Sequence, residues 1–398
     1  MKILAIDDQQ LVLLPLQKRL TELGYDVKIE TNARASIAVF NTFLPDLVIV
    51  DVNMPSISGL DIVKYIRRSQ KRHIPIMVLS GNTEDEVITK GFDLGIDDYM
   101  KKPLSLNEIC ARVKRLIGQP NIAVADTNSH VLIEQRCVGV VIPCYNEEER
   151  LSRKEFTDFI AKHSGYHLCF VNDGSSDNTL QILHNLREGR EDYITVYDCK
   201  TNGGKAEAVR LGMLHMAKKQ DLDYIGFLDA DLSTDLQDFD ALVSTIEHSN
   251  FKIVNGSRIS RMGANITKAS ARKIISMAIN LIIRKLLGMN FKDTQCGAKI
   301  FSKDIIHLAF SKKFVTKWLF DVEIFKRVAM YYGVETASGY ICEQPLKRWV
   351  HADGSKLSMK DSIKIIMQLG HIAWVYRTKK RVTLTKTMGV NYLLNDKY

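Results

Sequence analysis

The sequence predicts two α/β domains joined by a linker, and three observations support this fold class. The chain has 398 residues, which is more than one hydrophobic core usually holds. Short β-branched runs alternate with helical patterns over residues 1–118, and the same alternation begins again at residue 138. Between the two series, residues 119–136 lose both periodicities and contain Pro120, Asp126, Asn128 and Ser129, which are typical of a linker.

Composition and charge narrow the function classes. Hydrophobic residues make up 45% and charged residues 25%, which is globular and excludes a disordered or collagen-like chain. The formal net charge is +9, of which residues 1–118 carry +1 and the remainder +8. A basic surplus suits nucleic acid, an anionic membrane surface or a phosphorylated substrate, and charge alone does not choose among them.

Cysteine usage and apolar runs indicate the compartment. The seven cysteines are odd in number and form no CxxC pair, which argues against a disulfide framework or a zinc site. Aspartates at positions 7 and 8 interrupt the N-terminus before the apolar region of a secretory signal could form. No apolar run approaches the ~20 residues that span a bilayer. We expect a cytoplasmic protein, attached at most peripherally to the inner membrane face.

The pattern of the first domain predicts five strand–helix units. The predicted strands are KILAI, VKI, LVIV and IMVLS, followed by helices at 11–23, 33–43, 60–68 and 84–94 respectively, and a last strand lies near Tyr99. Such units predict a parallel, doubly wound sheet, in which functional residues collect at the carboxyl ends of the strands.

Those strand ends carry acids, a hydroxyl and a lysine. Asp7 and Asp8 follow the first strand, Asp51 ends the third, Ser80 ends the fourth and Lys102 follows the fifth. Three converging carboxylates favour Mg²⁺, and an aspartate beside that ion can attack a phosphoryl donor, which makes Asp51 the expected phosphoacceptor. Any one of these residues alone reads more simply as a helix cap or surface charge. All five together do not.

At this point residues 1–118 resemble the response regulator receiver domain, through IDD at 6–8, DLVIVDVNMPSISG at 46–59, LSG at 79–81 and DDYMKKP at 97–103. The resemblance implies a flavodoxin-like (βα)5 fold and phosphorylation of Asp51 by a histidine kinase or phosphotransfer protein. It also implies Mg²⁺ held by Asp8, Asp51 and the backbone carbonyl of Asn53, next to Asp7. Switching would involve Ser80, Tyr99 and Lys102.

The second domain, residues 137–357, shows no helix-turn-helix and instead places acids and amides after its strands. Asp229 and Asp231 follow the apolar run Tyr224 to Leu228, two residues apart, which suits one divalent cation that could also bind a diphosphate. Asp173 follows an earlier strand, where its carboxylate can accept a hydrogen bond from a nucleobase or ribose. Lys205 opens a helix after two glycines, where it can meet phosphate. A lone DxD is weak evidence, because two aspartates in a turn are common.

The run resembles a GT-A (Rossmann-like) glycosyltransferase of family 2, through VVIPCYNEEE at 140–149, FVNDGSSDNT at 170–179, GGKAEAVRLG at 203–212, FLDADLSTD at 227–235 and NGSR at 255–258. DTQCGAKIF at 293–301, WLFDVEIF at 318–325 and GSK at 354–356 are closer to dolichyl-phosphate β-glucosyltransferases and bacterial enzymes acting on polyprenyl phosphates. The resemblance implies inversion, a UDP-sugar or GDP-sugar donor, and Mg²⁺ or Mn²⁺ on Asp229 and Asp231. The donor-binding residues it implies are Pro143, Tyr145, Asn146, Glu147, Asp173, Lys205 and Asp229.

The acceptor decides which further residues the reaction needs. A polyprenyl phosphate is already anionic, with a second pKa of about 6, so it needs cations more than a base. Arg258, Lys356 and Arg348 are the expected guides. A sugar hydroxyl would instead need a carboxylate base, for which Asp321 is the first candidate and Glu323 the second. Either acid also fits a helix cap or surface charge.

Two amphipathic segments, and the joining of two different domains in one chain, each allow more than one interpretation. Residues 268–287 and the C-terminal helix with its basic tail, 358–398, fit either the core or an anionic lipid surface. The sequence therefore predicts a phosphorylation-regulated inverting glycosyltransferase. A non-catalytic nucleotide-sugar sensor is the alternative, direct DNA binding is a third reading that we do not expect, and homo-oligomerisation is left open.

Overall fold

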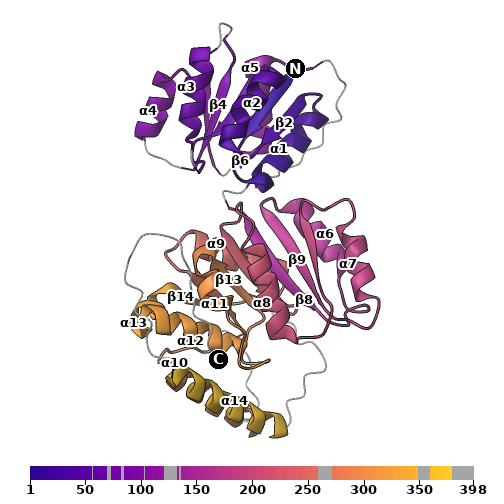
Figure 1. Ribbon diagram of the computed structural model, residues 1–398, viewed down its shortest axis with the longest axis vertical. Helices are drawn as coiled ribbons and strands as arrows, with labels where there is room; N and C mark the ends of the chain where they lie inside the picture. The colour runs from indigo at the N-terminus through magenta and orange to yellow at the C-terminus, as the bar shows by residue number, and fades with distance from the viewer. Residues whose placement is uncertain are drawn as a thin grey trace.

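The computed structural model describes residues 1–55, 57–69, 73–81, 85–102, 104–120, 132–133, 136–258, 271–347 and 359–378. Its two main sheets, of five strands from the first part of the chain and seven from the second, are each flanked by helices (Figure 1), and β6 (Leu104–Ser105) and β7 (Leu132–Ile133) form a separate two-stranded sheet. The prediction of two α/β domains is confirmed.

The first sheet has the order β2-β1-β3-β4-β5, and all of its strands are parallel. Strands β3 and β4 are buried along their whole length, as expected of strands covered by helices on both faces. The elements are β1 Lys2–Ile6, α1 Gln10–Glu22, β2 Asp26–Glu30, α2 Ala33–Phe43, β3 Leu47–Asp51, α3 Gly59–Ser69, β4 Ile76–Ser80, α4 Asp85–Asp93, β5 Asp98–Lys101, β6 Leu104–Ser105 and α5 Leu106–Ile117.

Local sequence explains where its helices begin. The side chain of Asn32 caps α2 by accepting from the backbone N–H groups of Arg34 and Ala35, and Ser105 caps α5 by accepting from Glu108. Within the segment predicted to be a linker, β7 (Leu132–Ile133) pairs antiparallel with β6. The end of the linker is thereby attached to the first domain through a pair that its irregular sequence did not indicate.

The second sheet is mixed, with the order β10-β9-β8-β11-β13-β12-β14. Strand β13 runs antiparallel to both neighbours, which places Gly297 beside the end of β11. The elements are β8 Val138–Cys144, α6 Arg153–Lys162, β9 Tyr166–Asp173, α7 Thr179–Arg187, β10 Ile194–Cys199, α8 Lys205–Met216, β11 Tyr224–Leu228, α9 Leu236–Glu247, β12 Ile253–Ser257, α10 Ala271–Leu287, β13 Ala298–Ser302, η1 Lys303–Ile305, α11 Ile306–Phe310, α12 Phe320–Tyr332, α13 Val334–Tyr340, β14 Ile341–Pro345 and α14 Met359–Thr378.

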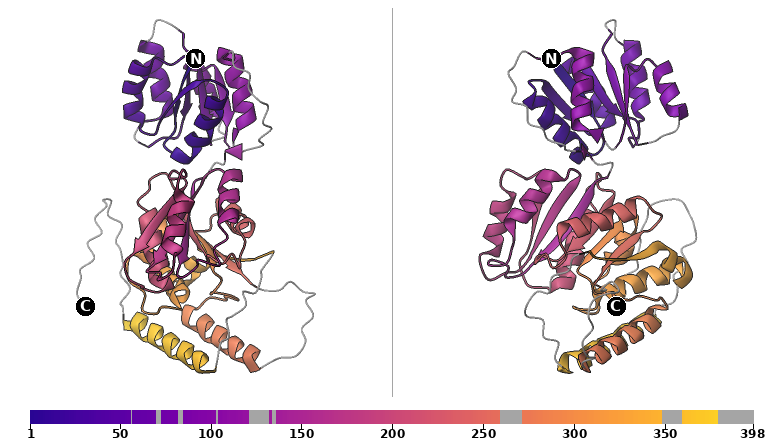
Figure 2. Two further views of the ribbon diagram at one scale, coloured as in Figure 1. Left: turned by 90° about the vertical axis from the view of Figure 1, so that its right-hand side faces the viewer. Right: turned by 180° about the vertical axis from the view of Figure 1, so that it is seen from behind.

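Helices α10 and α14 lie side by side at the end of the molecule far from the first domain (Figure 2). The inner face of α14 buries Leu369, Ile372 and Tyr376. Its outer face leaves Met367 61% and Trp374 67% exposed. The predicted C-terminal helix is therefore present, and its apolar residues lie on both the buried and the exposed face. Among the described helices, none combines the length and apolar character needed to cross a membrane.

His167 in β9 makes the stability of the second domain depend on pH. Its ring is 2% exposed and lies 2.7 Å from Thr195 Oγ1. Burial, aided by Lys219, lowers the pKa of His167 to about 3. An unfolded histidine has a pKa of about 6.5, so between these values only the unfolded chain binds the proton. Stability is fully present above the unfolded pKa and is lost as pH falls toward 3.

We expect His167 to contribute about 2 kcal/mol to the loss of stability between pH 7 and pH 5. Replacing His167 with Gln should remove that contribution, whereas His184→Gln, on the exposed side of α7, should retain it. Urea unfolding at both pH values can be followed by tryptophan fluorescence, because all three tryptophans lie after residue 137, in the second part of the chain. An equal pH effect in wild type and His167→Gln would contradict the assignment.

Candidate functional site

The first domain brings its predicted acids together at the carboxyl edge of the sheet. Asp7 and Asp51 are buried, Asp8 is half-buried, and one carboxylate oxygen from each lies within 4.8 Å of the other two. Parallel strands β1 and β3 are adjacent, so their carboxyl ends place these side chains side by side. All of the potential ligand atoms in this cluster are carboxylate oxygens, which are the ligands that Mg²⁺ prefers.

Lys102 connects two of these acids. Its Nζ lies 2.7 Å from Asp7 Oδ2 and 3.0 Å from Asp51 Oδ1. Burial raises the pKa of Asp7 to about 6, against the opposing effect of Lys102. Burial lowers the pKa of Lys102, but the carboxylates of Asp7 and Asp51 outweigh this effect and raise the pKa above its ordinary value. A cation is therefore fixed beside Asp51, where it can meet the oxygens of a phosphoryl group.

The remaining predicted receiver residues lie in or next to β3, β4 and β5. The backbone N–H of Asn53 donates to Asp51 Oδ2 at 2.9 Å, and Ser80 is fully buried at the end of β4. Tyr99 lies in β5, the strand that pairs with β4. Gly59, which sequence reasoning did not single out, allows α3 to approach, because a Cβ there would lie 2.0 Å from the carbonyl oxygen of Asp51.

In the second domain, the loops after β8 and β9 are bound to each other. The Oδ1 atom of Asn146 accepts from the backbone N–H of Ser176 at 2.9 Å, and the N–H of Glu147 donates to Thr179 Oγ1 at 2.8 Å. Tyr145 is 47% exposed, and Pro143 is partly buried at the end of β8. The predicted donor-binding residues from 143 to 147 thus form one ordered rim of the site.

Glu147 has unusual electrostatics within this rim. Its Oε1 pairs with Arg150 at 2.9 Å, but Oε2 is buried and, among the described residues, has no hydrogen-bond partner. Burial raises the pKa of Glu147, and the nearby carboxylate of Asp231 raises it further. Two carboxylates with this mutual effect are stabilised when a cation binds between or near them.

Asp173 fixes the loop that begins α8. Its Oδ1 and Oδ2 accept from the backbone N–H groups of Gly203 and Gly204, each at 2.8 Å. Gly204 has a φ of 85°, which glycine adopts without strain. Each carboxylate oxygen keeps a further lone pair, so the predicted contact of Asp173 with a nucleobase or ribose is not blocked by these bonds.

Asp229 lies at the centre of the site. Its Oδ1 is 2.5 Å from Lys205 Nζ, and its backbone N–H donates to the carbonyl of Gly297. A Cβ at Gly297 would lie 2.1 Å from Asp229 Oδ2, so only glycine leaves room for this carboxylate. Asp231, two residues on, is exposed. Asp229 and Asp231 both offer carboxylate oxygens, the donor type that a hard divalent cation prefers.

A second ion pair, which unlike the first is buried, joins Lys299 to Asp321. Lys299 Nζ lies 2.7 Å from Asp321 Oδ1 and donates to the carbonyl of Cys296 at 2.6 Å. Burial raises the pKa of Asp321, and Lys299 and Lys205 lower it in part. Lys299 was not among the predicted residues. A lysine inside the apolar run AKIFS was the available signal, because a buried ammonium needs an anionic partner.

The two acids of the FDVE segment differ in their environments. Glu323 is fully buried, and its carboxylate accepts from the backbone N–H groups of Val315 and Thr316, from Thr316 Oγ1 and from Tyr376 Oη. It therefore holds the preceding loop and α14 to α12. Asp321 is the acid of the pair that lies near Asp229 and Lys205.

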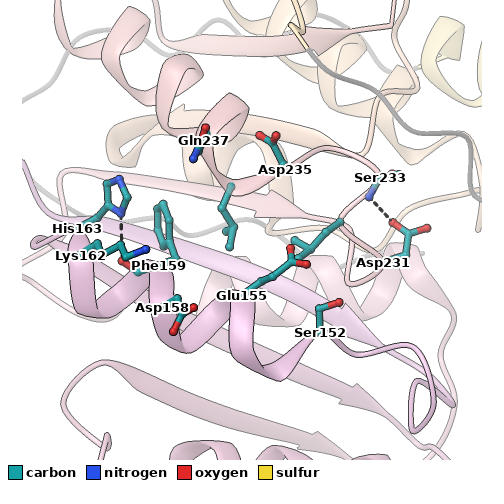
Figure 3. A pocket seen from close by; sticks show the side chains of 12 residues that line it. Ser152, Glu155, Asp158, Phe159, Lys162, His163, Asp231, Ser233, Asp235 and Gln237 are labelled. Atoms are coloured by element: carbon teal, nitrogen blue, oxygen red, sulfur yellow. Dashed lines mark hydrogen bonds between the residues drawn. The ribbon is translucent and has the colours of Figure 1, made fainter.

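Of the three basic residues predicted to guide the acceptor phosphate, the structure describes one. Arg258 binds Asp293 with two nitrogens, at 2.7 and 2.9 Å. Arg348 and Lys356 lie outside the described residues. A groove of about 520 Å³ between α6 and the loop after β11 is lined by acids such as Glu155, Asp158 and Asp235 (Figure 3). It reaches the site just described through Asp231.

Comparison with known proteins shows what this architecture is related to. The chain is 31% identical over 253 residues to the dolichyl-phosphate beta-glucosyltransferase ALG5A of Trichomonas vaginalis, covering 60% of this chain and 74% of that protein. The chain belongs to glycosyl transferase family 2. The model of that family matches residues 139–309, and a dolichyl-phosphate beta-glucosyltransferase of Saccharomyces cerevisiae is 30% identical over 65% of this chain and 82% of its own length.

This family 2 glycosyltransferase carries a second family domain at its N-terminus. The model of the response regulator receiver domain matches residues 3–114. The alkaline phosphatase synthesis transcriptional regulatory protein PhoP of Bacillus subtilis is 37% identical over 122 residues, which are 31% of this chain and half of that protein. The predicted receiver and GT-A folds are confirmed.

Proposed function

We propose that the protein is an inverting glycosyltransferase that moves a sugar from a nucleotide-sugar to a polyprenyl phosphate and is regulated by phosphorylation of Asp51. The observation that carries the transferase part is the pairing of Asp229 with Lys205 in a site shared with Asp231 and Glu147. The names of its relatives, dolichyl-phosphate beta-glucosyltransferases, favour glucose as the sugar, and we propose UDP-glucose as the first candidate donor. GDP-mannose is the second candidate.

In the proposed reaction, the bond between the anomeric carbon of the sugar and the diphosphate oxygen breaks, and the diphosphate leaves with both electrons of that bond. A phosphate oxygen of the acceptor forms the new bond to that carbon from the opposite face, which gives inversion. A divalent cation on Asp229 and Asp231, when bound, would supply Lewis-acid stabilisation of the leaving diphosphate. Lys205 is placed to contribute a further positive charge. The loop bonds of Asp173 keep the backbone of Lys205 in place.

The acceptor in this proposal needs positioning more than deprotonation. A polyprenyl phosphate is anionic at neutral pH, so Arg258 near the end of β12 is proposed to guide it, with Arg348 and Lys356. Asp321 would serve as base only for a hydroxyl acceptor. Its ion pair with Lys299 opposes the effect of burial, which raises the pKa of Asp321.

The outer surface of α10 and α14 suits a lipid-bound acceptor. Leu281 is 67% exposed, and Met367 and Trp374 are similarly exposed on the neighbouring helix. Lys285 and Arg377 are exposed near the C-terminal ends of the two helices. Each basic side chain near an anionic membrane contributes about 1 kcal/mol of attraction. We therefore propose peripheral attachment through this surface.

The regulatory part of the proposal is supported by a contact between the domains. Gln9, next to Asp8, donates from Nε2 to Asp223 Oδ2 at 2.9 Å. Asp223 immediately precedes β11, and Asp229 follows the same strand. One strand thus connects the edge of the phosphoacceptor site to the donor site. A histidine kinase or phosphotransfer protein would supply the phosphoryl group in the presence of Mg²⁺.

The transferase activity is tested by incubating the full chain with UDP-glucose or GDP-mannose, Mg²⁺ or Mn²⁺, and a short-chain polyprenyl phosphate. We expect one of the two sugars to appear on the lipid phosphate when the products are separated by chromatography. Reactions without lipid phosphate serve as controls. Measurable nucleotide binding without transfer or hydrolysis would contradict catalysis and support the nucleotide-sugar sensor instead.

A further inference from the structure

Lys205 forms an ion pair with Asp229, which is one of the carboxylates that the proposed metal site requires. Its ammonium lies 2.5 Å from Asp229 Oδ1, while the other oxygen of Asp229 faces Gly297, where even a Cβ would be only 2.1 Å away. An approaching cation therefore meets a carboxylate that is enclosed on one side by backbone and paired on the other with a positive charge.

The backbone of this lysine is fixed, but its side chain has freedom to move. Asp173 holds the N–H groups of Gly203 and Gly204, directly before Lys205 begins α8. The Lys205 side chain is 46% exposed and has a flexible four-carbon stem. A change of side-chain rotamer would let the ammonium leave Asp229 while the loop and the helix keep their positions.

An ammonium and a divalent cation repel each other when both bind one carboxylate oxygen. A diphosphate removes this conflict, because it offers oxygens to both. We propose that Lys205 neutralises Asp229 while the site is empty and moves to the diphosphate when the metal takes its place. This inference rests on the proposed function.

The exchange predicts coupled binding of metal and donor. Metal alone must displace the ammonium and binds weakly, whereas metal with a diphosphate gains the released lysine as an additional partner. Coupling of this kind is reciprocal, so the metal must strengthen nucleotide binding by the same factor.

The test measures Mn²⁺ binding by electron paramagnetic resonance, with and without UDP. The full chain should carry Asp8→Asn and Asp51→Asn, so that the receiver cluster does not contribute to the signal. In this background UDP should tighten Mn²⁺ binding about tenfold. Lys205→Met should bind Mn²⁺ alone about tenfold more tightly and lose most of the coupling.

Lys252→Met is the matched control, because it removes a lysine paired with Asp304 near the opposite end of β13. Its Mn²⁺ binding should equal that of the parent. A folded Lys205→Met variant, verified by thermal unfolding, that binds Mn²⁺ alone no more tightly than the parent would overturn the exchange. Absence of UDP binding in the parent would contradict the proposed function, while the titration without UDP would still decide the exchange.

Discussion

Replacing Asp229 with Asn is expected to lower sugar transfer by about 10²- to 10³-fold, the usual cost of losing a group that stabilises charge in a transition state. Asparagine keeps the size that the close approach of Gly297 demands, but it offers the diphosphate-bound cation a neutral oxygen. It also releases Lys205 from its ion pair. The initial rate of transfer from the preferred nucleotide-sugar gives the comparison.

Asp304→Asn is the control for this variant. It removes an acid that pairs with Lys252, at the opposite end of the sheet from Asp229. We expect it to retain wild-type transfer. If Asp229→Asn retained more than about a tenth of the wild-type rate, Asp229 would not have the charge-stabilising role proposed here.

Phosphoryl incorporation from acetyl phosphate and Mg²⁺ should fall to background when Asp51 is replaced with Asn. Asp51 is the acid of the cluster that Lys102 and the N–H of Asn53 both contact, which leaves its carboxylate oriented for attack on a phosphorus atom. The carboxamide of asparagine lacks the nucleophilic charge. Radiolabelled acetyl phosphate followed by denaturing electrophoresis measures the incorporation.

Asp61→Asn offers a matched control in the same domain, because Asp61 is an exposed acid of α3 paired with Lys64. That variant should incorporate phosphate as the wild type does. Labelling that persists in Asp51→Asn and disappears in a variant of Asp7 or Asp8 would show that the wrong aspartate had been assigned.

The receiver cluster could be predicted from sequence because its geometry follows from the sheet type. Carboxyl ends of parallel strands meet at one edge, so Asp7, Asp51 and Ser80 converge once the strands are recognised. The same reasoning places Asp229 and Asp173 near each other in the second domain. Neither assignment requires knowledge of side-chain packing.

The contacts that complete the second site depend on non-local pairing. Strand β13 inserts antiparallel between β11 and β12, and this insertion brings Gly297 and Lys299 to the site. No local pattern in the chain specifies that neighbour. The burial of Glu323 under Tyr376 likewise depends on how α14 docks on α12. Periodicity showed that α14 is amphipathic, but its apolar residues lie on both the buried and the exposed face.

The central claim is that one chain couples phosphoryl transfer at Asp51 to glycosyl transfer at Asp229. The most direct measurement is the turnover of the preferred nucleotide-sugar before and after treatment with acetyl phosphate and Mg²⁺, in wild type and in Asp51→Asn. We predict a change of about fivefold or more in the wild type and none in the variant. Unchanged wild-type turnover, with phosphorylation demonstrated in the same sample, would contradict the coupling.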